Sequence, residues 1–253
     1  MRDAPWDKIF NHFAIIDHDF KKGPFIITAQ QIKEATKGFT NTNEREVRIL
    51  CKQDTREERP EIFKKYNLFI LPINNGTYAI IEGEGYVDIK EIEEDTKEYK
   101  YTLDFDLDTS KIGNSEMQHL DFAYASSIIR TFINDPSLVL TIRGRKYTPK
   151  FSFLAGDHKH EITVESVQTE VDAGYEGRDN VVLIEAKNSK TNNIIVRQLF
   201  YPFRQWKQYT KKTVIPVFFE KRNDLYLLWQ FKFTDENNYN SIELVKSKKY
   251  KII

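Results

Sequence analysis

The alternation of apolar and polar residues predicts β-strands along much of the chain. Apolar runs at 68–73 and 77–81 flank Asn74-Asn75-Gly76, a sequence typical of a tight β-hairpin. The run at 214–220 is continuously apolar, which indicates a strand covered on both faces. Further β-type runs cover 138–154, 162–172, 181–184 and 225–233.

Helical spacing predicts short helices near the N-terminus. Residues 5–15 place four aromatic and aliphatic side chains on one face and predict a helix packed on a core: Trp6, Ile9, Phe10 and Phe13. Thr28 and Gln31 fit a capping box, which opens a helix that continues to about Lys37. Residues 60–67 predict another short helix, and 45–52 fit either a helix or a strand.

Two longer helices are expected in the second half. Apolar residues at spacings of three and four predict one helix that begins at Ser115 and ends before Pro136. Residues 194–209 predict another, which Pro202 should end or kink near Tyr201.

Three segments follow from these patterns. Helices followed by a hairpin suggest a winged-helix-like module in residues 1–95, residues 96–113 form an acidic connection, and a second domain occupies 114–253. The first module can contact DNA through Lys33 and Lys37 on the predicted helix and through the hairpin tip. It can equally be an α/β cap that supports the second domain.

Composition narrows the class of protein. The net charge is zero, but residues 111–253 carry an excess of about six positive charges. No apolar run reaches the length of a membrane span, and the N-terminus lacks the apolar core of a secretory signal. A lone cysteine, Cys51, excludes an intrachain disulfide, so a cytoplasmic location is expected.

The strongest chemical signal is the stretch 171–187. Asp172 ends one β-type run, a turn-rich segment follows, and the next apolar run ends in Glu185-Ala186-Lys187. Side chains alternate along a strand, so Glu185 and Lys187 share one face, and a hairpin lets Asp172 approach it. Two carboxylates form a hard oxygen site suited to Mg²⁺, and a lysine beside it can hold a water.

This pattern resembles the PD-(D/E)xK nuclease superfamily, in which an acidic residue on one strand and a (D/E)xK triplet on the next form the metal site. Val171 stands where the motif name has proline. The resemblance implies an α/β (α+β) fold, with a restriction-endonuclease-like core of one mixed sheet flanked by helices. It implies that Asp172 and Glu185 bind Mg²⁺ and that Lys187 orients or activates water. It also implies that the helix after the triplet assists through Gln198 or Arg197.

Basic residues suggest where DNA backbone phosphates would bind. Arg143, Arg145 and Lys146 form the densest cluster near the motif, although a solvated edge strand explains them equally. Arg197 and Arg204 recur along the predicted helix at 194–209, where the alternative is an ordinary surface helix.

Within the superfamily, the size and the compact N-terminal module look most like a Type II restriction endonuclease. That resemblance implies a Mg²⁺-dependent enzyme that cuts double-stranded DNA at specific sites, with a paired DNA methyltransferase in the same system. A homodimer is expected because such enzymes cut both strands of a symmetric site. A repair or recombination nuclease such as a resolvase, and a non-catalytic winged-helix DNA-binding regulator, remain as alternatives.

Overall fold

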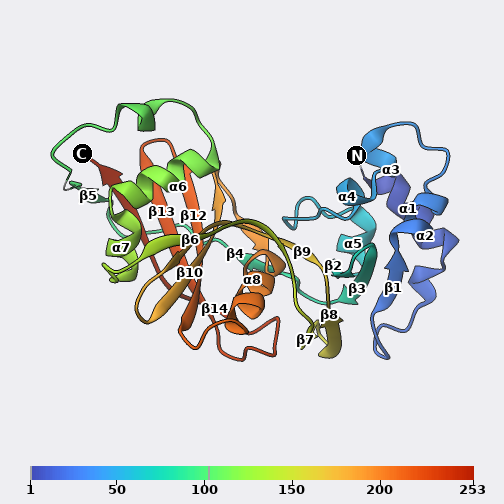
Figure 1. Ribbon diagram of the computed structural model, residues 1–253. Coiled ribbons are helices and arrows are strands. Elements are labelled where there is room, and N and C mark those ends of the chain that lie inside the picture. Colours follow the sequence, from blue (N-terminus) through green and yellow to red (C-terminus); the bar gives the residue numbers. More distant parts are fainter. Residues whose placement is uncertain (1, 102) are drawn as a thin grey trace.

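The computed structural model describes residues 2–101 and 103–253, which form a smaller N-terminal unit beside a larger C-terminal unit (Figure 1). The N-terminal unit is built from helices and a small antiparallel sheet with the strand order β1-β3-β2. Its elements are α1 (Asp3–His12), the 3₁₀ helix η1 (Ile15–Asp17), β1 (Phe25–Thr28), α2 (Ala29–Ala35), α3 (Thr42–Arg45), α4 (Val47–Leu50), α5 (Glu61–Lys65), β2 (Leu68–Asn74) and β3 (Thr77–Glu82).

Local signals in this unit form the structures that they predict. The capping box is present, because Thr28 accepts a hydrogen bond from the Gln31 backbone and the Gln31 side chain accepts one from Thr28. Gly76 adopts a positive φ of 73° at the turn between β2 and β3, a conformation that glycine adopts without strain.

The C-terminal unit is an α+β structure in which helices flank a mixed sheet, as expected. Within the described residues this main sheet has seven strands in the order β5-β14-β13-β12-β10-β9-β6. The elements of the unit are β4 (Tyr86–Asp88), β5 (Lys97–Tyr99), the 3₁₀ helix η2 (Asp108–Lys111), α6 (Glu116–Ala125), α7 (Ile128–Ile133), β6 (Val139–Tyr147), β7 (Phe151–Ala155), β8 (His160–Val164), β9 (Gln168–Glu176), β10 (Asn180–Lys187), β11 (Asn193–Ile195), α8 (Arg197–Lys207), β12 (Thr213–Arg222), β13 (Leu225–Phe233) and β14 (Ile242–Ile252).

Opposite faces of the main sheet are covered by different helices (Figure 1). Leu120 of α6 and Phe132 of α7 pack with Ile184 on one face. Phe200 of α8 packs with Leu183 on the other face. Strand β10 therefore lies between two apolar layers, and its neighbour β12 runs parallel to it after the crossover through α8.

The small sheet is also buried on both faces. Leu68 and Ile70 of β2 pack with the helices of the N-terminal unit. Phe69 and Leu71, which alternate with them, pack into the same core as Phe200 of α8. The two units therefore share one hydrophobic core.

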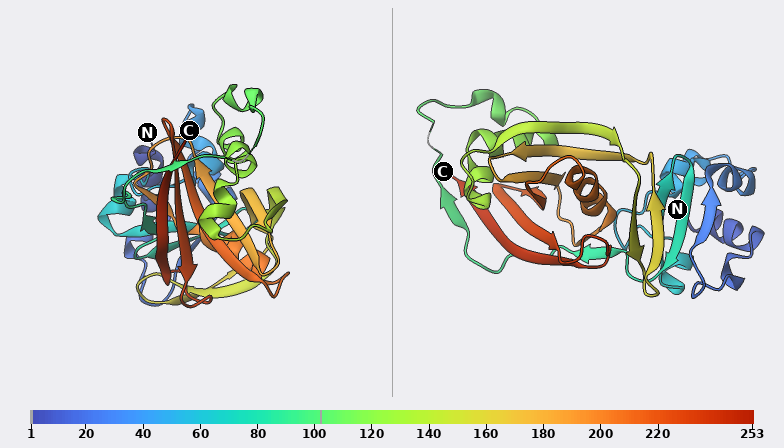
Figure 2. Two further views of the ribbon diagram at one scale, coloured as in Figure 1. Left: turned by 90° about the vertical axis from the view of Figure 1, so that its left-hand side faces the viewer. Right: turned by 60° about the horizontal axis from the view of Figure 1, so that its bottom comes forward.

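A long two-stranded extension helps to join the units. Strands β6 and β9 extend from the main sheet toward the N-terminal unit, and the hairpin β7–β8 lies between them in sequence and packs beside β2 (Figure 2). His160 in this hairpin hydrogen-bonds the Phe20 carbonyl at 2.7 Å, and His158 bonds the Glu82 carboxylate at 2.8 Å.

The prediction of one long helix after Ser115 is wrong. The chain forms α6 and α7, separated at Ser126 and Ser127. Ser126 donates its hydroxyl to the Phe122 carbonyl at 2.7 Å, and Ser127 has a positive φ of 66°. Serine hydroxyls that bond the preceding turn compete with helix propagation, which accounts for the break.

The expectation that Pro202 ends the helix near Tyr201 is also wrong. Helix α8 continues through Pro202 to Lys207, and it begins only at Arg197 because 193–195 form strand β11. Proline removes one backbone hydrogen bond. Its neighbours Tyr201 and Phe203 are buried in the shared core, and this packing holds the helix together.

In the part of the chain that the structure describes, no helix combines the length and the apolar character that crossing a membrane requires.

Gly174 of β9 lies in the main sheet between β6 and β10, and a substitution there tests how tightly these strands pack. A Cβ placed there would lie 2.6 Å from the Cβ of Ile142 on β6, so Gly174→Ala should destabilise the fold by about 1–3 kcal/mol. Urea unfolding measures this. Gly23→Ala is the control, because a Cβ at Gly23 meets no atom within 4 Å. Equal stability of both variants would contradict the packing argument.

Candidate functional site

Strands β9 and β10 bring the predicted acidic residues together. They pair antiparallel from Val181 opposite Glu176 to Ile184 opposite Ala173. The next step along both strands reaches Glu185 and Asp172. The Ala186 backbone N–H donates to Asp172 Oδ2 at 2.8 Å, which fixes this carboxylate beside the triplet.

The triplet alternates as expected between the faces of the sheet. Ala186 is buried in the core under α6 and α7, whereas Glu185 faces α8. Lys187 Nζ donates to Glu185 Oε1 at 2.5 Å and to the Ala186 carbonyl at 2.9 Å. One lysine ammonium thus binds two oxygens of its own triplet.

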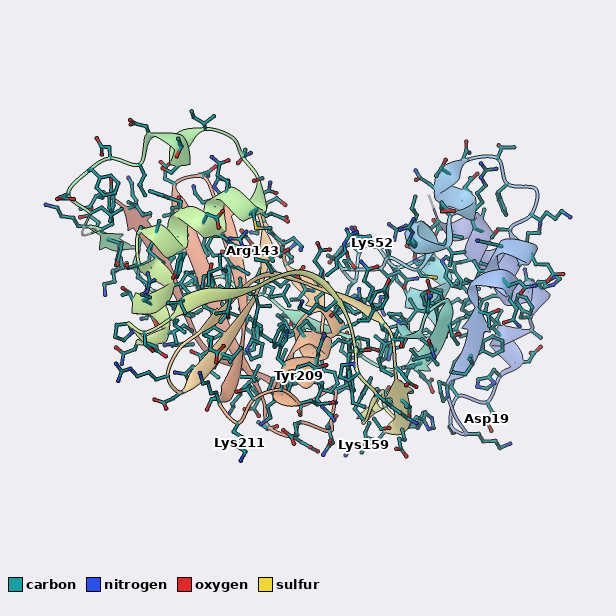
Figure 3. All side chains as sticks on the ribbon, in the orientation of Figure 1. Asp19, Lys52, Arg143, Lys159, Tyr209 and Lys211 are labelled. Atoms are coloured by element: carbon teal, nitrogen blue, oxygen red, sulfur yellow. The ribbon has the colours of Figure 1, made fainter. Side chains whose placement is uncertain are left out.

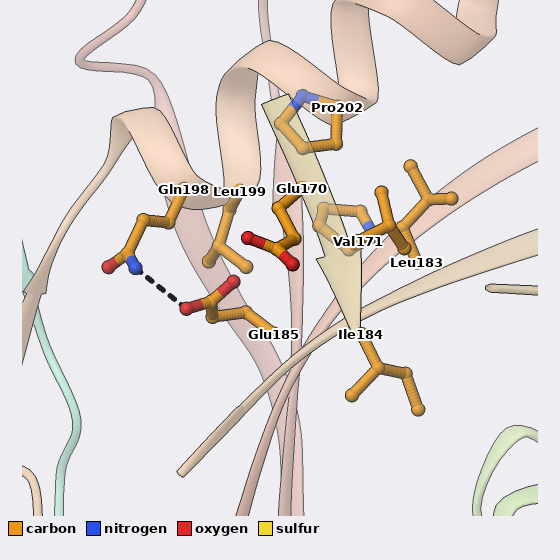
Figure 4. A pocket seen from close by; sticks show the side chains of 9 residues that line it. Glu170, Val171, Leu183, Ile184, Glu185, Gln198, Leu199 and Pro202 are labelled. Atoms are coloured by element: carbon orange, nitrogen blue, oxygen red, sulfur yellow. Dashed lines mark hydrogen bonds between the residues drawn. The ribbon is translucent and has the colours of Figure 1, made fainter. Parts of the chain in front are cut away.

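Helix α8 contributes the third predicted group. Gln198 Nε2 donates to Glu185 Oε1 at 2.6 Å, and the two side chains face one another in a small pocket under the helix (Figure 4). Glu170 and Pro202 also line this pocket. Within the described residues, Gln198 Oε1 is buried and has no hydrogen-bond partner. The amide therefore has an unused acceptor, which points away from Glu185 (Figure 4).

Burial sets the electrostatics of the two acids. It raises the pKa of Glu185 to about 7; the charge of Asp172 adds to this, while Lys187 opposes it. Burial also raises the pKa of Asp172, and the bond from Ala186 and the charge of Lys187 counteract it. The positive charge of Lys187 is therefore too small to stabilise both carboxylates fully in their ionised forms.

Lys187 remains a cation in this environment. Burial lowers the pKa of Lys187, but the attraction of Glu185, Glu116 and Asp172 outweighs it, so the pKa lies above its ordinary value. At neutral pH the ammonium can donate hydrogen bonds and offset negative charge, but it cannot accept a proton.

The donor set fits a small hard cation. Asp172, Glu185 and the Ala186 carbonyl present oxygens only, and both carboxylates favour added positive charge, as their raised pKa values indicate. Across residues 2–101 and 103–253, no group of three or more His, Cys, Asp or Glu side chains is arranged to hold a metal. Mg²⁺ needs no such cage, because it is typically held by one or two carboxylates and retains several waters.

Three further carboxylates surround the pair. Glu116, in the first turn of α6, contributes to the raised pKa of Asp172, so its charge reaches the site as well as the helix terminus. Glu170, two residues before Asp172, could contact a metal or a basic neighbour. Its carboxylate accepts a hydrogen bond from Arg145 Nε at 3.2 Å. Asp54 of the N-terminal unit contributes to the raised pKa of Glu185.

Asp54 is the residue that the sequence did not reveal. It lies in the loop between α4 and α5, more than a hundred residues before the motif, and no local pattern marks it. Its position depends on how the two units pack, which a single sequence does not show. The catalytic residues that the sequence does predict, Asp172, Glu185, Lys187 and Gln198, all lie together.

The basic residues predicted to bind DNA occupy different environments. Arg145 and Lys146 are exposed on β6. Arg143 pairs with Asp121 of α6. Arg143 lies on the same edge of the molecule as Lys52 of the N-terminal unit, whereas Tyr209, Lys211 and Lys159 lie on the opposite edge (Figure 3).

Arg197 and Arg204 on α8 make contacts within the protein. Arg197 pairs with Asp54 at 3.6 Å. Arg204 lies over the rings of Phe151 and Phe200 and donates to the Glu236 carbonyl, and its burial lowers its pKa. Arg204 therefore packs against other parts of the protein through these contacts.

Lys33 and Lys37 are exposed near α2. This helix packs through Ile32 on the face of the small sheet opposite to the one that meets α8. These lysines therefore lie on the outer side of the N-terminal unit, away from the carboxylates, and can reach only DNA that extends beyond the site.

Two family models match consecutive parts of the chain. A domain of unknown function (DUF6996) matches residues 3–80, and another domain of unknown function (DUF6997) matches residues 81–251. The chain therefore belongs to the DUF6997 family. The two matches meet within β3, whereas the predicted join between the domains lies at 95–113, in and beside the acidic connection. Neither the curated proteins nor the solved structures gave a match.

The raised pKa of Glu185 predicts a pH-dependent stability. The folded protein binds this proton up to about pH 7, while an ordinary glutamate releases it near 4.5, so folding stability falls as pH rises between these values. Glu185→Gln removes the titration. From pH 5 to 7.5 the variant should therefore gain about 2–3 kcal/mol relative to wild type.

Denaturant unfolding in EDTA at the two pH values measures this gain. Glu161→Gln, on the exposed side of β8, is the control and should show no such trend. A pH-independent difference between Glu185→Gln and wild type would show that Glu185 titrates as an ordinary acid.

Proposed function

We propose that this protein is a Mg²⁺-dependent endonuclease that hydrolyses phosphodiester bonds in double-stranded DNA. The observation that carries the proposal is the convergence of Asp172, Glu185, Lys187 and Gln198 from two adjacent strands and the following helix. Two partly buried carboxylates, a cation and an amide are the groups that this hydrolysis uses.

The order of elements supports a PD-(D/E)xK-like core. Helices α6 and α7 are followed by the antiparallel strands β6, β9 and β10, then by α8 and by β12, which is parallel to β10. The superfamily likewise places a helix before its catalytic strands and another after the triplet. Hairpin β7–β8 is inserted between β6 and β9 and packs against the N-terminal unit.

Asp172, Glu185 and the Ala186 carbonyl would hold the metal ion. Bound there, Mg²⁺ would supply Lewis-acid stabilisation of the charge on the phosphate oxygens. Gln198 fixes the rotamer of Glu185 through their 2.6 Å bond. The Glu185 carboxylate is thereby kept in place before substrate arrives, which lowers the reorganisation needed in the reaction.

Lys187 acts as a cation and hydrogen-bond donor, because its pKa lies above the ordinary value. It orients the attacking water and offsets charge that develops on the phosphate. In the reaction a bond from the water oxygen to phosphorus forms while the opposite bond from phosphorus to a sugar oxygen breaks. The attacking water loses one proton, and the departing sugar oxygen gains one, so that the proton balance closes.

The N-terminal unit would share in DNA recognition. Its order of helix, strand, helices and hairpin, and the sheet order β1-β3-β2, resemble a winged helix. The exposed Lys33 and Lys37 and the hairpin tip are its candidate DNA contacts. We propose a Type II restriction endonuclease that acts as a homodimer and has a partner methyltransferase protecting the same sites.

Digestion of DNA tests the activity directly. An unmethylated phage DNA and a methylated plasmid are incubated with the protein in Mg²⁺ and in EDTA. Discrete fragments that require Mg²⁺ would support a site-specific enzyme, and preference for branched DNA would indicate a resolvase. Binding without cutting, under all these conditions, would indicate a regulator and refute the nuclease.

Replacement of Asp172, Glu185 or Lys187 with Ala should abolish detectable cutting. Each removes a group that acts on the reacting phosphate, and a loss of at least about 100-fold is expected. Initial cleavage rates on the phage DNA measure it, with circular dichroism to verify folding. Glu161→Ala should cut normally, and wild-type rates in any of the three site variants would refute the assignment.

Gln198→Ala should reduce cleavage only in part. It removes the bond to Glu185 but no metal ligand, and partners of this kind are typically worth about 10–100-fold in metal affinity or activity. A higher Mg²⁺ concentration at half-maximal rate is therefore expected. Kinetics identical to wild type would make Gln198 merely structural.

A further inference from the structure

The start of helix α8 is held by groups outside the helix, one of which belongs to the N-terminal unit. The Ile195 backbone N–H, at the end of β11, donates to the Asp54 carbonyl at 2.8 Å. The next residue, Val196, donates to the Gly85 carbonyl at 3.0 Å, and the Arg197 backbone N–H donates to the Tyr239 hydroxyl at 2.9 Å. Three successive backbone groups before Gln198 are thus held from outside the helix.

The loop between α4 and α5 is itself anchored on β11. Asn193 is buried, and its side-chain oxygen accepts a bond from the Arg56 backbone at 2.7 Å. Its amide nitrogen donates to both oxygens of Glu57, at 3.0 and 2.9 Å. The loop is therefore positioned by the strand that leads directly into α8.

One side-chain ion pair joins this loop to α8 itself. Arg197 NH2 lies 3.6 Å from Asp54 Oδ1, and the two side chains are only 23% and 16% exposed. The residue after Arg197 is Gln198, whose amide bonds Glu185. The ion pair therefore lies one residue from the contact that orients a candidate metal ligand.

We infer that Asp54 is a positioning residue of the active site, supplied by the N-terminal unit, that holds the first turn of α8 so that Gln198 meets Glu185. The inference rests on the proposed function. It assigns the DUF6996 match a part in the chemistry as well as in recognition.

Geometry explains why this contact matters. The bond from Gln198 to Glu185 is 2.6 Å long, so a small displacement of the helix start would break it and release Glu185 to other rotamers. The negative charge of Asp54 also reaches Glu185, where it contributes to the raised pKa. Arg197 offsets that charge while it ties the loop to the helix.

Charge variants at the ion pair test the inference in the full-length protein. Asp54→Asn should lower kcat on the phage DNA by about 10–100-fold and raise the Mg²⁺ concentration at half-maximal rate, while KM for DNA changes little. Asp54→Glu, which keeps the charge, should recover much of the rate. The exchange D54R/R197D should cut faster than either single variant.

Asp88→Asn is the matched control. Asp88 pairs with Arg56 of the same loop, but it lies on β4, so this ion pair joins the loop to a strand and not to α8. If Asp54 only helps the units to dock, both variants should lose thermal stability and activity alike. Equal kinetics of Asp54→Asn and Asp88→Asn, or no recovery in Asp54→Glu, would overturn the inference.

Calorimetric titration with Mg²⁺ alone separates this inference from the proposed function. Weaker binding in both Glu185→Ala and Asp54→Asn, with Asp88→Asn unchanged, would support both. Weaker binding only in Glu185→Ala would keep the metal site and overturn the role of Asp54. Absence of Mg²⁺ binding and of cutting in the wild-type protein would overturn both.

Discussion

The burial of both faces of the small N-terminal sheet is the constraint on which the rest of the structure depends. Strand β2 alternates Leu68 and Ile70 toward its own helices with Phe69 and Leu71 toward α8. Separating the units would expose the second pair and its partners to water, at about 1.5–3 kcal/mol for each large apolar side chain. The units therefore act as one body, and the loop that carries Asp54 keeps a fixed place beside α8.

At the site two effects on the carboxylates oppose one another. Burial disfavours ionised carboxylates, as the raised pKa of Glu185 and of Asp172 shows. Hydrogen bonds from Ala186, Lys187 and Gln198 favour the ionised forms and fix their directions. The result is a fixed pair of acids whose negative charge is only partly neutralised. Acids with perturbed pKa values of this kind are concentrated at functional sites.

The sequence predicts the parts of this site that lie on local patterns. Glu185 and Lys187 are two residues apart on an apolar strand, so alternation was enough to place them on one face. Gln198, on the next helix, was expected only from the resemblance to the nuclease superfamily, with Arg197 as the alternative. The break at Ser127 and the continuity through Pro202 depended on hydrogen bonding and core packing that override helix propensity. The place of Asp54 depended on docking between distant segments, which no local pattern encodes.

Charge explains why substrate and metal binding should be coupled under the proposed function. The carboxylates of Asp54, Glu116, Glu170, Asp172 and Glu185 lie around the site, and their charges are felt within it. Lys187, Arg145, Arg197 and Lys52 each pair with one of these acids, but four cations offset five carboxylates only in part. A phosphate would be repelled by the remaining negative charge unless a divalent cation accompanied it. The neutral overall charge of the chain is then no obstacle to DNA binding, because the cation supplies the missing charge where the reaction takes place.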